Sequence, residues 1–307
     1  MGHPKAWLFP GQGSQIVGMG KALADQFPDA ARTYNEANEA LGFDLRALCW
    51  DAPTSELERT ANAQPAILAT SIAALRAAQA QGLKLDAPIL LGHSLGEFTA
   101  LAASGAIEFA DALRLVRKRG ELMQAADTSG GMAAVLGLDA DAVAKAIDGT
   151  GIVVANDNAP GQVVITGPLA AMPKATKALK TAGAKRVIPL KVSGAFHSPA
   201  MRAVAPALAE AIRATPFNEL KYRVIANVDA QPHEHASDFV TLLEKQVHSP
   251  VQWVASVRRA AQEGATTFVE FGAGNVLTGL VKRILPDART ANVSDPATLE
   301  EALNLVR

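Results

Sequence analysis

The chain has 307 residues, of which 49% are hydrophobic, 19% charged and 5% aromatic. This apolar content excludes a disordered chain, because it can form a core that offsets the conformational entropy lost on folding. The 29 basic and 30 acidic side chains give a net charge of −1, which favours neither nucleic-acid nor anionic-membrane binding, so chemistry on a small molecule is the default expectation.

No stretch of the sequence predicts a membrane segment or an oxidising environment. The first residues lack the apolar core of a signal peptide, and no later run approaches the ~18 uninterrupted apolar residues of a membrane span. The single cysteine, Cys49, cannot form an intrachain disulfide and suits a reducing compartment. We therefore expect a cytoplasmic protein.

The N-terminal part of the chain alternates strand-like runs with amphipathic helical stretches. Strands are predicted over residues 6–9 and 87–91, and helices over 18–42 and 64–82, with a further helix after the second strand. This alternation is typical of a parallel sheet covered by helices, and thus of the α/β class.

The pattern changes in the middle of the chain. Strands are predicted over residues 132–138, 152–155, 163–166 and 186–192, and helices over 139–147 and 169–182. The order β-α-β-β-α-β is that of a ferredoxin-like unit. We therefore predict a small inserted subdomain over residues 128–192, with residues 1–127 and 193–307 forming the larger core.

The first pattern returns near the C-terminus. Strands are predicted over residues 222–227 and 267–271, and helices over 251–264 and 277–285. This block can extend the same parallel sheet as the N-terminal one.

The pentapeptide Gly92-His93-Ser94-Leu95-Gly96 stands between a predicted strand and a predicted helix. In that context Gly-x-Ser-x-Gly is typical of a nucleophile elbow, whose glycines permit close backbone approach while the serine is held at the sheet's carboxyl edge. The Leu95 N–H is then the natural first donor to an oxyanion. The pattern predicts Ser94 as a nucleophile; the alternative is a serine that only caps the helix.

A serine nucleophile needs a base, and the chain offers six histidines: His3, His93, His197, His233, His235 and His248. His3 near the terminus, and His233 and His235 in a polar loop, are expected to be solvated. The side chain of His93, next to the nucleophile, is expected to point away from it. His197 follows the last strand of the predicted subdomain, where the chain returns to the larger core, and sites form in clefts between domains. We predict His197 as the base, with His248 as the second choice.

Arg119 lies on the apolar stripe of a helix predicted over residues 109–126, one turn after Leu115. An inward-facing arginine is costly unless it is paired or meets an anion. Because a guanidinium binds a carboxylate bidentately, Arg119 is placed to hold the acid end of a substrate. A structural ion pair with Glu97 or Asp111 is the equal alternative.

These residues belong to an ordered set of motifs by which the chain resembles the malonyl-CoA:acyl carrier protein transacylases of fatty-acid synthesis and the acyltransferase domains of polyketide synthases. The motifs run almost end to end: Phe9–Gln15, Gly92–Glu97, Arg119, Gly161–Ile165, Ala195–Ser198, Gln246, Pro250–Trp253 and Gly274–Leu280. The resemblance implies an α/β-hydrolase-like core, mostly parallel, with an inserted ferredoxin-like subdomain.

The resemblance also implies residue roles. Ser94 would be the acylated nucleophile and His197 its base, while Arg119 would bind the malonyl carboxylate. Backbone N–H groups of Gln12 and Leu95 would form the oxyanion hole, and Gln246 would orient the histidine through its main-chain carbonyl, with no acidic third member. Phe196 resembles the residue found at this place in malonyl-selecting acyltransferases.

By the same resemblance the substrates would be malonyl-CoA and acyl carrier protein, the mechanism would be ping-pong, and the protein would be a monomer without an organic cofactor. The sequence has no histidine and cysteine cluster with zinc spacing and no calcium loop, so no metal is expected. Acyl carrier proteins are acidic, so basic residues around the cleft are candidates for docking: Arg117, Lys185, Arg186 and Lys191. Alternatives are a serine hydrolase or thioesterase, a malonate decarboxylase subunit, a trans-acting polyketide acyltransferase and a non-catalytic scaffold.

Overall fold

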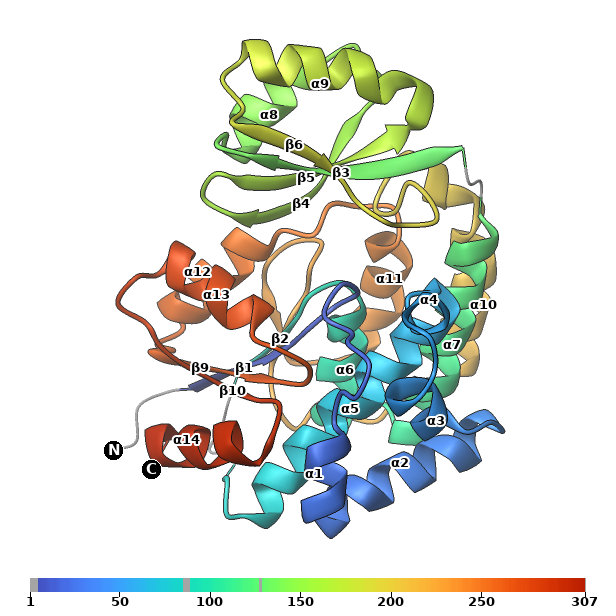
Figure 1. The fold of residues 1–307 in the computed structure, drawn as a ribbon, viewed down its shortest axis with the longest axis vertical. Helices are drawn as coiled ribbons and strands as arrows, with labels where there is room; N and C mark the ends of the chain where they lie inside the picture. The colour runs from blue at the N-terminus through green and yellow to red at the C-terminus, as the bar shows by residue number, and fades with distance from the viewer. Residues whose placement is uncertain (1–4, 85–88, 127–128, 307) are drawn as a thin grey trace.

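The structure is a computed structural model that describes residues 5–84, 89–126 and 129–306, and within these residues it has two separate β-sheets (Figure 1). The larger has six strands in the order β10-β9-β1-β2-β7-β8. Its strands are β1 (Lys5–Phe9), β2 (Ile89–Gly92), β7 (Val224–Ile225), β8 (Pro232–His233), β9 (Thr267–Phe271) and β10 (Arg289–Val293). All neighbours are parallel except β8, which is antiparallel to β7. The N- and C-terminal blocks therefore share one sheet.

Side chains of β1 alternate between two apolar layers. Ala6 and Leu8 pack with α12 (Trp253–Gln262) and α13 (Val276–Ile284). Trp7 and Phe9 face the opposite layer, which includes α5 (Thr60–Ala80), α6 (Leu95–Ala103) and α7 (Phe109–Ala125). Helices cover both faces, which explains why the central strands are continuous apolar runs.

The helix predicted over residues 18–42 is in fact two helices, α1 (Lys21–Gln26) and α2 (Pro28–Leu41). Phe27 between them is extended, with φ −116° and ψ 115°, because a proline disfavours the helical conformation in the residue before it. Pro28 itself starts α2, where its missing N–H costs nothing. The other described helices around the larger sheet are α3 (Leu45–Trp50), α4 (Thr54–Leu57), α10 (Ala205–Ala214), α11 (Ala236–Gln246) and α14 (Pro296–Val306). A short 3₁₀ helix spans Pro199–Ala203.

The smaller sheet is antiparallel and has the order β4-β5-β3-β6. Its elements are β3 (Gly130–Leu136), α8 (Ala140–Ile147), β4 (Val153–Ala159), β5 (Gln162–Pro168), α9 (Met172–Thr181) and β6 (Arg186–Pro189). Figure 1 shows α8 and α9 on the outer side of this sheet, with its other side toward the larger part of the molecule. The unit has its own apolar core, in which Val135, Val143, Ile165 and Leu179 are fully buried.

Several contacts attach the smaller unit to the larger one beside α12 and α13. Asn156 forms a parallel β-bridge with Val251, and the Arg283 guanidinium donates to the main-chain carbonyl of Pro160 at 2.6 Å. The predicted start of the second strand at residue 87 and the predicted subdomain start at residue 128 lie outside the described residues. Within the described part of the chain, no helix has the length and apolarity that crossing a membrane requires.

The elbow glycines stand where backbones nearly touch. A Cβ on Gly96 would lie 1.9 Å from the Phe9 carbonyl oxygen, and one on Gly92 would lie 1.9 Å from the Gly96 carbonyl carbon. We expect Gly96→Ala to lower the free energy of unfolding by about 3 kcal/mol, because the backbone must shift to admit the methyl group. Denaturation in urea measures this change.

Gly279 provides the matched control, because it lies inside α13 and a Cβ there would meet no atom within 4 Å. Gly279→Ala should raise the free energy of unfolding by about 0.4–1 kcal/mol. Equal unfolding midpoints for Gly96→Ala and the wild type would contradict the close approach at the elbow.

Candidate active site

A cavity of about 530 Å³ lies between the two units, within the usual size range of small-molecule sites. Its walls come from the loop after β1, the turn between β2 and α6, α7, the smaller sheet and α13. The lining includes these residues selected from the sequence: Gln12, Ser94, Leu95, Arg119, Phe196 and His197. Residues more than a hundred positions apart in the sequence therefore meet here.

Ser94 sits in a strained turn at the N-terminus of α6, with φ 52° and ψ −103°. The strained turn is stabilised by hydrogen bonds to Asn227, which follows β7 and is buried. Its side-chain oxygen accepts from the Ser94 N–H at 2.7 Å, and its side-chain amide donates to the Gly92 carbonyl at 2.6 Å. The Ser94 hydroxyl is thus fixed at the carboxyl edge of the sheet, as an elbow requires.

The Ser94 hydroxyl contacts the ring of His197. The Oγ lies 2.8 Å from Nε2 of His197, while Nδ1 of the same ring lies 3.0 Å from the main-chain carbonyl of Gln246 and 3.1 Å from that of Ser249. Because both neighbours of Nδ1 are acceptors, Nδ1 carries the proton and Nε2 is free to accept the serine proton.

Electrostatics keep that ring neutral. Burial, followed by the nearby charge of Arg119, lowers the pKa of His197 to about 3. At neutral pH the imidazole is therefore unprotonated, which is the form a general base needs.

Arg119 is buried, with 1% of its surface exposed. Its guanidinium donates to Oε1 of Gln64 at 2.9 Å, to Oε1 of Gln246 at 3.0 Å and to Oγ of Ser94 at 3.1 Å. Burial lowers the pKa of Arg119 to about 10, so it remains a cation at neutral pH. The arginine is thus held by neutral oxygens and contacts the Ser94 hydroxyl.

The ion pair considered for Arg119 is not formed. Asp111 pairs with Arg114 at 2.8 Å, and among the described residues no carboxylate oxygen lies within 4.0 Å of the Arg119 nitrogens, Glu97 included. A buried cation without a carboxylate partner can receive one from a ligand.

The main-chain N–H groups of Gln12 and Leu95 both belong to residues of the cavity wall. Within the described part of the chain, neither N–H donates to a protein acceptor. The side chain of Gln12 is occupied separately, donating to Thr60 at 3.3 Å. Phe196 is buried beside His197, with 5% of its surface exposed.

Sequence reasoning missed two residues that organise the site, Asn227 and Gln64. Asn227 is the last residue of a predicted strand, and an amide at the carboxyl end of a parallel strand is a signal for a functional edge. Gln64 had no comparable local signal. His3 lies outside the described residues.

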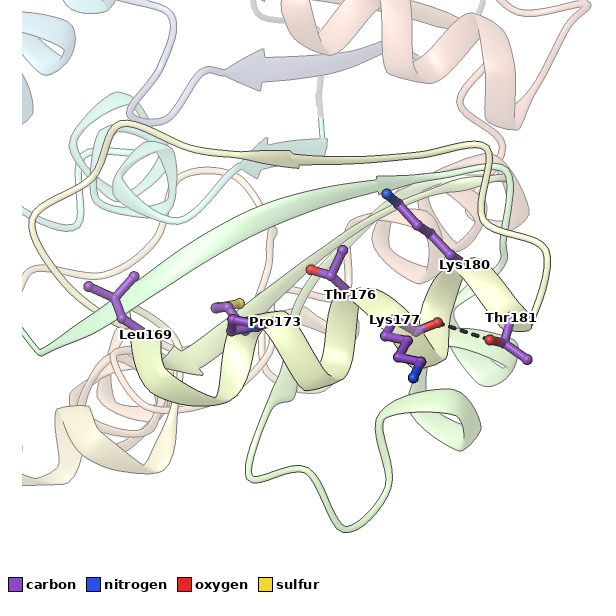
Figure 2. A pocket seen from close by; sticks show the side chains of 7 residues that line it. Leu169, Pro173, Thr176, Lys177, Lys180 and Thr181 are labelled. Carbon is purple, nitrogen blue, oxygen red and sulfur yellow. Dashed lines mark hydrogen bonds between the residues drawn. The ribbon is translucent and has the colours of Figure 1, made fainter.

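A second hollow, of about 630 Å³, lies along α9 on the outer side of the smaller unit (Figure 2). Figure 2 shows Lys177 and Lys180 toward the C-terminal end of this helix and Leu169 at its other end. The hydrogen bond drawn is that of the Thr181 hydroxyl to the Lys177 carbonyl, at 3.1 Å. Its wall contains no serine, cysteine or histidine. The chemistry therefore belongs to the first cavity.

Fold and site together define the class of protein: an α/β enzyme in which a serine hydroxyl contacts a neutral histidine and a buried arginine. The chain belongs to the acyl transferase domain family, whose model matches residues 6–299.

Curated relatives match over nearly the full length. The malonyl CoA-acyl carrier protein transacylase of Bacillus subtilis is 44% identical over 309 residues, covering 98% of this chain and 97% of the relative. The enzyme of the same name from Escherichia coli is 42% identical over 306 residues, covering 98% and 99%.

Solved structures agree with these relatives. An acyl carrier protein S-malonyltransferase from Vibrio cholerae superposes with a TM-score of 0.93 at 42% identity, covering 97% of this chain and 99% of that one. A malonyl-transacylase in complex with its type II polyketide acyl-carrier protein superposes with a TM-score of 0.94 at 40% identity, covering 98% and 99%.

Proposed function

We propose that this protein transfers a malonyl group from malonyl-CoA to the phosphopantetheine thiol of an acyl carrier protein, through a malonyl-serine intermediate, to supply fatty-acid or polyketide chain extension. The observation that carries the proposal is the buried Arg119 guanidinium, which lies 3.1 Å from a serine hydroxyl that also contacts a neutral histidine. The family and the names of its relatives support the substrate and the acceptor.

The first half of the reaction forms the ester. His197 Nε2 takes the proton of the Ser94 hydroxyl as Oγ attacks the thioester carbonyl. The oxyanion is stabilised by the N–H groups of Gln12 and Leu95, and the malonyl carboxylate binds Arg119. Collapse of the intermediate breaks the C–S bond, and coenzyme A leaves with the proton held by His197.

The second half reverses these steps with a different thiol. The phosphopantetheine thiol gives its proton to His197 and its sulfur attacks the ester carbonyl, so that Ser94 recovers its proton and the malonyl thioester of the carrier protein leaves. Gln246 holds the imidazole through its main-chain carbonyl, and Phe196 limits the acyl group next to it. The cycle is ping-pong and uses only side chains and main-chain groups of the protein, without a metal or organic cofactor.

The proposal includes a division of the chain into a ferredoxin-like subdomain and an α/β-hydrolase-like core. The β-α-β-β-α-β order and the antiparallel order β4-β5-β3-β6 support a ferredoxin-like subdomain over residues 128–192. Residues 1–127 and 193–307 then form an α/β-hydrolase-like core. We place the enzyme in the cytoplasm as a monomer, in contact with neither membrane nor nucleic acid.

The carrier protein would dock near the cavity mouth. Lys191 lines the cavity, and Lys185 and Arg186 lie at the start of the strand that leads to it. Their charges complement an acidic carrier. Arg117 is already engaged, with Glu121 at 2.7 Å.

A serine hydrolase is the competing function, since it would use the same Ser94. It gives a buried, carboxylate-free Arg119 no role and would rely on His248, whereas the serine hydroxyl contacts His197. A malonate decarboxylase subunit or a trans-acting polyketide acyltransferase would share the whole site and differ only in its acceptor.

Intact-protein mass after mixing with malonyl-CoA tests the proposal. The wild type should gain one malonyl group and lose it on addition of holo acyl carrier protein, while Ser94→Ala should gain none, because it lacks the attacking oxygen. Continuous release of coenzyme A without an adduct would instead favour the hydrolase. An adduct that the carrier protein does not discharge would favour a different acceptor.

A further inference from the structure

Glu97 is a buried carboxylate to which the proposed reaction assigns no task. It lies in the first turn of α6, three residues after the nucleophile, and is fully buried. One oxygen, Oε2, accepts two hydrogen bonds, whereas Oε1 has no partner among the described residues. Burial raises the pKa of Glu97 to about 7. Carboxyl groups whose pKa is perturbed by burial and by charged neighbours cluster at functional sites.

The first hydrogen bond fixes the side-chain amide of Gln246. That amide donates to Oε2 of Glu97 at 2.7 Å and to the Ser94 carbonyl at 2.8 Å. Its oxygen is thereby turned toward Arg119, whose guanidinium donates to it at 3.0 Å. If the amide flipped, its N–H₂ would face the guanidinium, and two donors would oppose each other. The main chain of Gln246 holds the His197 ring at 3.0 Å.

The second hydrogen bond fixes the residue that clamps the nucleophile. The main-chain N–H of Asn227 donates to Oε2 of Glu97 at 3.2 Å. The Asn227 side chain bridges the elbow by accepting from the Ser94 N–H and donating to the Gly92 carbonyl. One carboxylate oxygen therefore connects α6, the segment after β7 and the end of α11.

We propose that Glu97 is a positioning residue for acyl transfer, because its Oε2 orders the Gln246 amide and the Asn227 backbone, and these hold the arginine, the base and the nucleophile. The inference rests on the proposed transfer reaction. In this role Glu97 acts by accepting two hydrogen bonds at Oε2. An amide oxygen at the same place can accept both.

The test compares two substitutions of Glu97 with the same two at Glu270. Glu270 is a matched control: it is fully buried on β9, its Oε2 accepts from the N–H and hydroxyl of Thr278 at 2.8 and 3.2 Å, and its Oε1 is also without a partner among the described residues. Each variant is mixed with malonyl-CoA, and the rate of malonyl-serine formation is followed by mass. Circular dichroism gives the folded fraction.

We expect Glu97→Met to slow ester formation by about 100-fold or more, because displacements of about 1 Å in a site cost that much. Glu97→Gln, which keeps an acceptor, should stay within about tenfold of the wild type, and so should Glu270→Met and Glu270→Gln. A rate for folded Glu97→Met within about tenfold of the wild type would overturn the proposal, as would an equal loss in folded Glu270→Met.

If Glu97→Met does not fold, Glu97→Gln decides. A rate within about tenfold of the wild type supports hydrogen-bond positioning, and a larger loss overturns it, since the amide oxygen can keep both contacts. The proposed function fails separately, when the wild type itself forms no malonyl adduct.

Discussion

Replacing Arg119 by alanine is expected to reverse the acyl-group preference of the enzyme. The guanidinium is buried, and among the described residues its hydrogen bonds go to neutral oxygens, so a malonyl carboxylate would be its ionic partner. Leaving that carboxylate buried and unpaired costs about 2–5 kcal/mol, which lowers the rate of malonyl-serine formation by roughly 30- to 5,000-fold. An acetyl group carries no charge that needs a partner. Arg119→Ala should therefore transfer it at a rate equal to or above that of the wild type.

The measurement is the ratio of malonyl to acetyl adduct formed from equimolar malonyl-CoA and acetyl-CoA. Arg114→Ala is the control, because Arg114 lies on the same helix but is exposed and pairs with Asp111 at 2.8 Å. Its ratio should equal that of the wild type. A malonyl preference retained in Arg119→Ala would remove the arginine from substrate binding.

Replacing His197 by alanine is expected to slow malonyl-serine formation by about 10²–10⁴-fold, the range that general-base catalysis supplies. The ring contacts the Ser94 hydroxyl at 2.8 Å, and its neutral form is present at neutral pH because burial and Arg119 lower its pKa to about 3. The burst rate of coenzyme A release measures the loss.

His248→Ala is the control for that variant. It should leave the burst rate unchanged, because His248 has a role only in the serine hydrolase hypothesis. The wild-type pH profile gives a second check. With a depressed pKa the base stays unprotonated as the pH falls, so the burst rate should change less than about threefold between about pH 8 and about pH 5. If the base had the ordinary histidine pKa of about 6.5, the burst rate would instead fall about thirtyfold by about pH 5.

The central sheet could be predicted because its strands are buried on both faces. The run Ala6–Phe9 is apolar throughout, and all four residues are buried. Edge strand β10 was missed because Arg289–Val293 is polar and half-exposed, so neither alternation nor a continuous apolar run marks it. The break at Phe27 was visible in the sequence as the proline that follows it, and the long amphipathic pattern obscured it.

The site could be predicted only where chemistry leaves a local pattern. Ser94 stands in a pentapeptide between a strand and a helix, and Arg119 interrupts an apolar stripe, so spacing alone marks both as candidates. The contact of Asn227 with Ser94 joins residues 133 positions apart, and no local periodicity reports such a pair. Gln246 came from the family resemblance alone, because a glutamine near the end of a helix has no signature of its own.

Ser94 and His197 share a property that opposes stability to activity. Both are non-glycine residues with positive φ, 52° and 56°, and such a backbone costs of order 1–3 kcal/mol at each position. Glycine would relieve that strain at either position and, under the proposed function, would abolish the reaction. Variants that tolerate more heat can therefore arise at the cost of turnover, and selection for thermal resistance alone would favour an inactive protein over the working one.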